Sequence, residues 1–144
     1  MFLNILVAVD GSVHSDRALE EALDIARTQR SRLTLISAAA PTSWRFMAGP
    51  YAGLLPTKED AERKAEETLR AARERVGDIP VTTIVGEGAA AHAILKHAQA
   101  GNHDLIVMGS RGRGGAAAAL LGSVSHDVPH HSTVPVLIVH ATPD

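Results

Sequence analysis

The sequence alternates short, uninterrupted apolar runs with longer segments in which apolar residues recur every three or four positions. The short runs predict strands buried on both faces of a sheet, and the longer spacing predicts helices that bury one side. Parallel strands need crossover connections, which helices supply. The alternation therefore predicts an α/β fold with one open, doubly wound parallel sheet and helices on both faces. The five predicted strands cover residues 5–9, 33–38, 81–85, 105–108 and 136–139.

Helix start and stop signals lie between these runs. Helical spacing predicts a helix over 13–29, and Thr57 followed by Asp60 predicts a capping box at the start of a second helix. Glu, Arg and Lys of balanced sign on the other face of that helix predict a solvated surface. We expect Gly88 to open a third helix. Pro129 predicts that a fourth helix, starting at Ser123, is short or kinked.

Composition limits the classes of partner. The 144 residues fit one domain over 1–144, and 14 basic against 16 acidic residues leave no positive field for nucleic acid. No apolar run approaches the roughly 20 residues of a membrane span. The apolar start of the chain is better explained by a buried strand than by a signal peptide. Because the chain has no cysteine, it suits a reducing cytoplasm, where we expect it.

Glycine and serine gather after the first and fourth predicted strands. Asp10-Gly11-Ser12 follows the first, and a glycine-rich segment from Gly109 to Gly122-Ser123 follows the fourth. In such sheets ligands bind at the carboxyl ends of strands, where the strand order reverses. Glycine lets main-chain N–H groups approach a ligand, and a helix start at Gly122-Ser123 favours an anion. Arg111 and Arg113 add positive charge. The segment predicts a phosphate group held mainly by backbone.

The pattern Gly109-x2-Gly112-x9-Gly122-Ser123 resembles the nucleotide-binding motif of the universal stress protein family, in its ATP-binding branch. Residues 5–12 resemble the opening strand and turn of that family, residues 104–112 its fourth strand and loop, and residues 122–125 and 134–139 its ending. The resemblance covers essentially the whole chain. It implies the strand order 3-2-1-4-5, which places the first and fourth strands side by side, and a dimeric, nucleotide-responsive module of the stress response.

The resemblance also implies a set of ATP-binding residues. Asp10 would lie near the ribose or a Mg²⁺ ion bound to the nucleotide, Ala38 would offer backbone groups to adenine, and Met108 and Gly109 would line the sugar. Phosphates would be held near the start of the fourth helix, and residues 7–9 would form the floor. Four alanines at 116–119 depart from larger or polar residues in many relatives. The implied set, with Arg111 from the charge argument, is Ala8, Val9, Asp10, Ala38, Met108, Gly109, Arg111, Gly112, Gly122, Ser123, Val124 and Ser125.

Several alternatives stay open. Asp10 also has the chemistry of a turn former before a helix, a role compatible with nucleotide binding. His126 and His130 have the spacing of two metal ligands on one helix face, but Pro129 lies between them, and surface or interface histidines explain them better. No serine nucleophile motif is present. Slow ATP hydrolysis, and a nucleotide-free dimerisation protein of the same fold, are the competing functions.

Two segments bear on assembly and access. The run at 136–139 predicts an apolar edge strand, and edges of this kind are normally blunted or paired. Relatives pair this strand with its copy, so the resemblance implies a symmetric homodimer. Residues 39–56 lack periodicity, which is typical of a functional lid or of a disordered loop.

Overall fold

In the part of the chain that the structure describes, five strands lie parallel in one sheet of order β3-β2-β1-β4-β5, the order that the family resemblance implied. The computed structural model describes residues 1–39, 49–54, 57–110 and 124–141. Strand β1 is central and pairs with β2 on one side and β4 on the other, with Val7 opposite both Leu35 and Val107. The strands are β1 (Asn4–Ala8), β2 (Arg32–Ala38), β3 (Val81–Gly86), β4 (Leu105–Gly109) and β5 (Val136–Val139).

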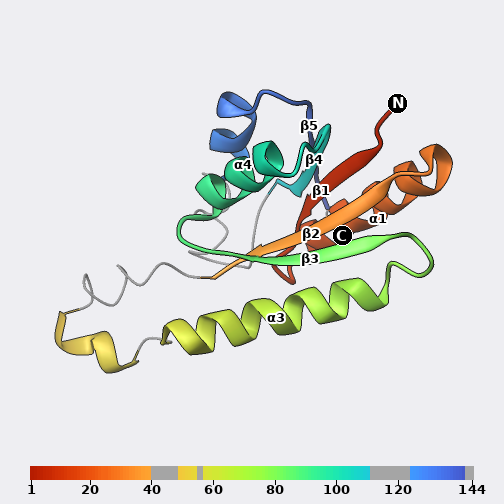
Figure 1. The fold of residues 1–144 in the computed structure, drawn as a ribbon. Coiled ribbons are helices and arrows are strands. Elements are labelled where there is room, and N and C mark those ends of the chain that lie inside the picture. The colour runs from red at the N-terminus through yellow and green to blue at the C-terminus, as the bar shows by residue number, and fades with distance from the viewer. Residues whose placement is uncertain (40–48, 55–56, 111–123, 142–144) are drawn as a thin grey trace.

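Helices cover both faces of the sheet (Figure 1). One face carries α1 (Val13–Gln29) and α3 (Lys58–Glu74), and the other carries α4 (Ala90–Ala100) and a helix over residues 124–131. A short 3-10 helix, η1 (Gly49–Leu54), precedes α3. The parallel strands and the helices on both faces of the sheet thus agree with the doubly wound arrangement that the alternating periods predict.

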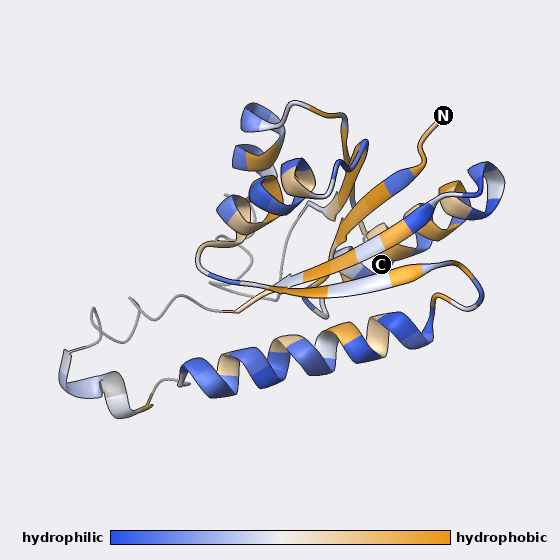
Figure 2. Cartoon of the chain, in the orientation of Figure 1, coloured by the Kyte–Doolittle hydropathy of each residue, from blue (hydrophilic) through white to orange (hydrophobic). Residues whose placement is uncertain are grey.

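Successive residues of β1 feed two separate cores. Ile5 and Val7 are fully buried against α1 and α3, whereas Leu6 is fully buried against α4 and the 124–131 helix. Alternate side chains of a strand point to opposite faces, so a strand covered on both sides must be apolar throughout. Figure 2 shows this as largely hydrophobic central strands beside an α3 that is mostly hydrophilic on its outer side.

The helix caps follow the sequence signals. The side chain of Thr57 accepts the N–H of Asp60 at 3.1 Å, and the Asp60 carboxylate accepts the N–H of Thr57 at 3.2 Å, which completes the predicted capping box. The hydrogen bonds from Thr57 lower the pKa of the Asp60 carboxyl. Ion pairs such as Lys58–Glu62 lie on exposed side chains, in agreement with a solvated outer face.

Two helix boundaries differ from expectation or refine it. Gly88 does not open α4: its φ of +78° is left-handed, and the helix begins two residues later at Ala90. Pro129 lies inside the helix over 124–131, which ends at His131, so this helix ends soon after the proline. Its predicted start at Ser123 lies outside the described residues. Within the described part of the chain, no helix is both long and apolar enough to cross a bilayer.

Candidate functional site

The turn after β1 is held by a chain of local hydrogen bonds around Asp10. Oδ1 of Asp10 accepts the N–H of Ser12 at 2.8 Å, and the N–H of Asp10 donates to Oγ of Ser15 at 3.0 Å. Oγ of Ser12 in turn accepts the N–H of Ser15 at 3.1 Å, which caps α1. Gly11 has a φ of +82°, a left-handed conformation that favours glycine. Asp10 therefore does form the turn, and its carboxylate is fixed at the carboxyl end of β1.

The carboxyl end of β4 lies directly against the first turn of α1. A Cβ built on Gly109 would stand 2.8 Å from the backbone carbon of His14, closer than real contacts allow. Glycine is thus required at this position by packing. The next residue, Ser110, donates its N–H to the carbonyl of Val139 at 2.9 Å. The ends of β1, β4 and β5 therefore meet around one helix start.

His14 links these strand ends, although no sequence motif included it in the site. Its Nδ1 accepts the N–H of Ala141 at 3.0 Å and lies 3.3 Å from Oγ of Ser110. Because Nδ1 accepts a hydrogen bond, the proton of the neutral ring lies on Nε2. Only the position of His14 in the sequence could have placed it at the site, because the first turn of a helix that follows a strand lies at that strand's carboxyl end.

The helix over 124–131 begins beside the same edge. Oγ of Ser125 donates to the carbonyl of Ser110 at 3.1 Å, across 15 positions of sequence. Val124, half-buried, packs against the core formed with α4. The structure thus brings two members of the implied phosphate set, Val124 and Ser125, next to the end of β4.

The remaining implied residues divide into three groups. Ala8 and Asp10 are half-buried and Val9 is buried, and all three lie at the end of β1. Ala38 ends β2 and is half-buried, with Gly86 of β3 as its register partner. The side chain of Met108 is buried in the core on the α4 face. Arg111, Gly112, Gly122 and Ser123 lie outside the described residues, as does the alanine run at 116–119.

A cavity of about 390 Å³ borders the turn after β1 on its α3 side. Val9 and Gly11 form one wall, and charged side chains of both signs, among them Lys64 and Glu67 of α3, form the other. Arg75 lies there too and pairs with Asp16 at 3.2 Å and with Glu20 at 3.1 Å. This ion-pair network joins the end of α3 to the start of α1.

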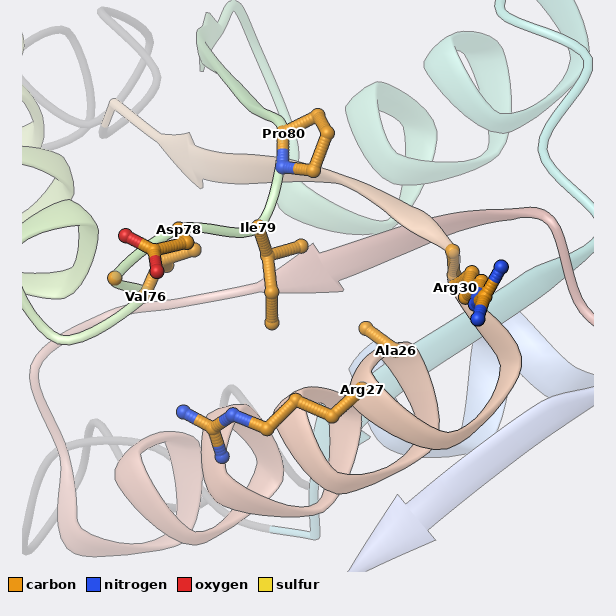
Figure 3. A pocket seen from close by; sticks show the side chains of 9 residues that line it. Ala26, Arg27, Arg30, Val76, Asp78, Ile79 and Pro80 are labelled. Carbon is orange, nitrogen blue, oxygen red and sulfur yellow. The ribbon is translucent and has the colours of Figure 1, made fainter.

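A second cavity, of about 690 Å³, lies at the opposite end of the sheet (Figure 3). Its lining comes from residues that precede β2 and β3 and from the ends of α1 and α3. Ala26 and Arg27 lie on α1, and Asp78 and Ile79 lie across from them in the segment that precedes β3. Since ligands of parallel sheets bind at the carboxyl ends of strands, this cavity is separate from the candidate site.

The histidine pair that the sequence singled out lies on the surface, as expected. His126 and His130 are exposed and their rings stack with centroids 6.1 Å apart. His103, in contrast, is 6% exposed and belongs to the interior. Among the described residues, no group of three or more His, Cys, Asp or Glu side chains is arranged to hold a metal ion.

The strand order and the meeting of the β1 and β4 ends define a Rossmann-like α/β protein. Residues 1–140 match the model of the universal stress protein family, and the chain belongs to that family. It is 35% identical over 147 residues to universal stress protein YxiE of Bacillus subtilis, and the alignment covers 96% of this chain and 99% of YxiE. A Thermus aquaticus universal stress protein is 35% identical over 142 residues, with 96% and 99% covered.

One further relative is longer than this chain, and two others have solved structures. Universal stress protein Rv2005c of Mycobacterium tuberculosis is 36% identical, but the chain spans only 44% of it. A crystal structure of a universal stress protein in complex with cAMP is 30% identical, with a TM-score of 0.73 and 98% and 99% of the two chains covered. UspA from Lactobacillus plantarum is 25% identical, with a TM-score of 0.78 and 96% and 97% covered.

Proposed function

We propose that the chain is a cytoplasmic universal stress protein that binds ATP at the carboxyl ends of β1 and β4 and acts as a dimeric, nucleotide-responsive module. The observation that carries the proposal is the convergence at one edge of the Asp10 turn, the end of β4 and the first residues of the 124–131 helix. The hydrogen bond from Ser125 to the carbonyl of Ser110 fixes the last of these. The relative solved with cAMP supports an adenine nucleotide as the ligand class.

Phosphate binding rests on the sequence around this edge. The glycines and serine of the motif Gly112-x9-Gly122-Ser123 lead into the helix over 124–131. Main-chain N–H groups at a helix start attract anions because they lack partners within the helix. Arg111 would add a charge-assisted contact. In this proposal the phosphates face the helix start and the sugar lies over Gly109.

Asp10 would act through its charge. One carboxylate oxygen, Oδ1, already holds the N–H of Ser12, so the carboxylate has a fixed position at the half-buried end of β1. A carboxylate oxygen suits Mg²⁺, which is commonly held by one or two carboxylates together with substrate phosphates. Asp10 would therefore contact the ribose or hold Mg²⁺ that arrives with the nucleotide.

The dimer would form through β5. This strand is the edge of the sheet next to β4, and its four residues Val136–Val139 are all apolar. Leu137 is 36% exposed. An exposed apolar edge is normally covered, and a second copy across a two-fold axis offers the same apolar surface in return.

Isothermal titration calorimetry with Mg²⁺ and ATP, ADP, AMP and cAMP in turn tests the nucleotide site. Asp10→Asn keeps an acceptor for the N–H of Ser12 but removes the charge, and Gly122→Ala alters the phosphate turn. We expect each variant to weaken ATP binding at least about tenfold, or 1.4 kcal/mol. Arg27→Ala, at the cavity of Figure 3, is the matched control and should bind like the wild type. ATP affinity unchanged in both site variants would refute the assignment.

The rate of phosphate release distinguishes the proposed ATP-binding protein from the competing ATP hydrolase. Phosphate release from ATP by the wild type, at a steady rate well above about 1 s⁻¹, would mark an ordinary enzyme. We expect phosphate release to be slower than this. Mass spectrometry of the purified native protein would identify any nucleotide that remains bound.

A further inference from the structure

The cavity of about 690 Å³ in Figure 3 lies at the end of the sheet opposite to the proposed nucleotide site. Ligand pockets in proteins commonly have volumes of about 300–1,000 Å³, so this cavity has room for a small molecule. Its lining comes from the end of α1, the short turn into β2, and the segment between α3 and β3. None of these segments belongs to the nucleotide site, so a ligand bound here would be a separate one.

Apolar residues supply part of the lining. Ala26 and Val76 are each 1% exposed and belong to the core that α1 and α3 form with the sheet. Half-buried Ile79 packs against the same core, and Pro80 next to it is exposed. The apolar surface that a ligand would contact is therefore mainly that of Ile79 and Pro80. Covering it with an apolar molecule is favourable in proportion to the area removed from water.

Two arginines give this lining a net positive charge. Among the described residues that line the cavity, Arg27 and Arg30 are basic and Asp78 is acidic. Arg27 lies 3.9 Å from the carboxylate of Asp24, whose side chain is 77% exposed, and surface pairs of this kind contribute little. Arg30 forms no ion pair within the part of the chain that the structure describes. Both guanidinium groups therefore keep their capacity to bind an anion.

The cavity beside the Asp10 turn provides a contrast. Its arginine, Arg75, is paired with Asp16 at 3.2 Å and with Glu20 at 3.1 Å. That guanidinium joins α3 to α1 and is already neutralised by two carboxylates. At the opposite end of the sheet, no described ion pair uses an arginine to join two elements.

The backbone of Arg30 gives a second reason to assign its side chain a role. Arg30 ends α1 in a left-handed conformation, with a φ of +57° and a ψ of +43°, and its N–H donates to the carbonyl of Ala26. Glycine is the usual residue at a helix end of this kind, because a Cβ is unfavourable in left-handed backbone. The chain thus carries an arginine where the helix end alone would favour glycine. What the arginine adds at this position is a guanidinium group beside the cavity.

We propose that this cavity binds a small amphipathic monoanion, a molecule with an apolar body and one carboxylate. Arg27 and Arg30 hold the carboxylate, and the apolar body covers Ile79. Guanidinium groups suit this task because their planar N–H donors match the two oxygens of a carboxylate. The partial negative charge at the end of α1 is smaller than the full charges of two guanidinium groups. Asp78 would repel a second negative charge on the ligand, which favours a carboxylate over a dianionic phosphate.

Titration of the wild type with sodium octanoate, followed in isoleucine-methyl NMR spectra, tests the proposal. We expect the Ile79 methyl signal to shift and that of Ile138, in β5 at the other edge of the sheet, to stay in place. Arg30→Gly and Arg27→Gln should each weaken binding about three- to tenfold, between the effects of an exposed ion pair and of a charge-assisted hydrogen bond. Arg70→Gln, at an exposed arginine of α3 outside this lining, is the matched control and should keep the wild-type affinity.

Arg30→Gly also separates binding from folding. Because glycine suits the left-handed backbone at this position, the variant should be at least as stable as the wild type in urea while it binds octanoate more weakly. Octylamine and 1-octanol carry the same apolar body with a positive charge or with none. We expect both to bind more weakly than octanoate, since neither offers a carboxylate to the two arginines.

The proposal is refuted if the wild type does not bind octanoate, or if octylamine or 1-octanol binds as tightly. Unchanged octanoate affinity in both arginine variants would refute it as well. Shifts at Ile138 without any at Ile79 would indicate adsorption on the edge strand instead of binding in the cavity. ATP affinity should be unchanged in Arg30→Gly, and none of these outcomes depends on a nucleotide, so the two proposals fail independently.

Discussion

His14 and Ala141, 127 positions apart in the sequence, are joined by a hydrogen bond from the Ala141 N–H to Nδ1 of the imidazole. This bond fastens the segment after β5 to the first turn of α1. The same ring nitrogen lies 3.3 Å from Oγ of Ser110, so His14 connects the ends of β4 and β5 at the proposed nucleotide site.

Replacing His14 by Ala should loosen the segment after β5. The loss of a hydrogen bond of this kind costs about 0.5–1.5 kcal/mol of unfolding free energy. Amide hydrogen exchange should accelerate at Ala141, and urea denaturation should report the lower stability. His126→Ala, at an exposed histidine whose ring stacks on His130, should leave both unchanged. Unaltered exchange at Ala141 in His14→Ala would contradict the role assigned to the ring.

Gly109→Ala should separate β4 from α1. The added Cβ would meet the backbone of His14 at 2.8 Å, and backbone atoms cannot move aside as a flexible side chain does. Overpacking of this kind costs about 1–3 kcal/mol. Gly53→Ala is the control, because a Cβ there meets nothing within 4 Å and the residue has no left-handed φ. Equal urea midpoints for the two variants would show that the contact tolerates a methyl group.

Stability should fall at mildly acidic pH through His103. Burial lowers the pKa of this ring in the folded protein from an ordinary value of 6.5. Below about pH 6.5 the unfolded chain therefore binds a proton that the folded chain resists, and the free energy of unfolding decreases as the pH falls. Urea denaturation at pH 7.5 and 5.5 measures the effect. His103→Leu should show a smaller decrease, and an equal decrease in both proteins would exclude His103 as a source.

Leu137→Glu should give a monomer if β5 forms the dimer interface. A symmetric contact would bring the two introduced carboxylates close together, and like charges at an interface are costly. Light scattering on a sizing column measures the mass of each protein in solution. Leu54→Glu introduces the same charge at an 83% exposed leucine and should leave the mass unchanged. A wild type that is already monomeric would rule out the dimer.

The spacing of apolar residues was enough to predict where most helices and strands lie in the sequence. The helix over Val13–Gln29 and the strand over Val136–Val139 have the predicted bounds, since each is set by burial on a recognisable face. Strand order was different: period shows that a strand is buried but not which strands are its neighbours. The order came from the family resemblance, and the pairing of Val7 with Val107 confirms it.

The contacts that complete the site were harder to predict. His14 meets Ser110 and Ala141 only because three strand ends converge, and no local pattern encodes contacts across 96 and 127 positions. No sequence pattern marked His103 as buried, although it follows a left-handed Asn102 and packs beneath the end of α4. Polar residues buried by tertiary packing leave little trace in hydrophobic spacing.

The close approach of Gly109 to His14 has a consequence for affinity. The end of β4 and the start of α1 already pack closely in the folded chain. A molecule that binds at this edge would therefore contact a surface whose conformational entropy was lost on folding. Association is costly mainly where loops and side chains must be ordered. At this part of the edge, little entropy remains to be lost.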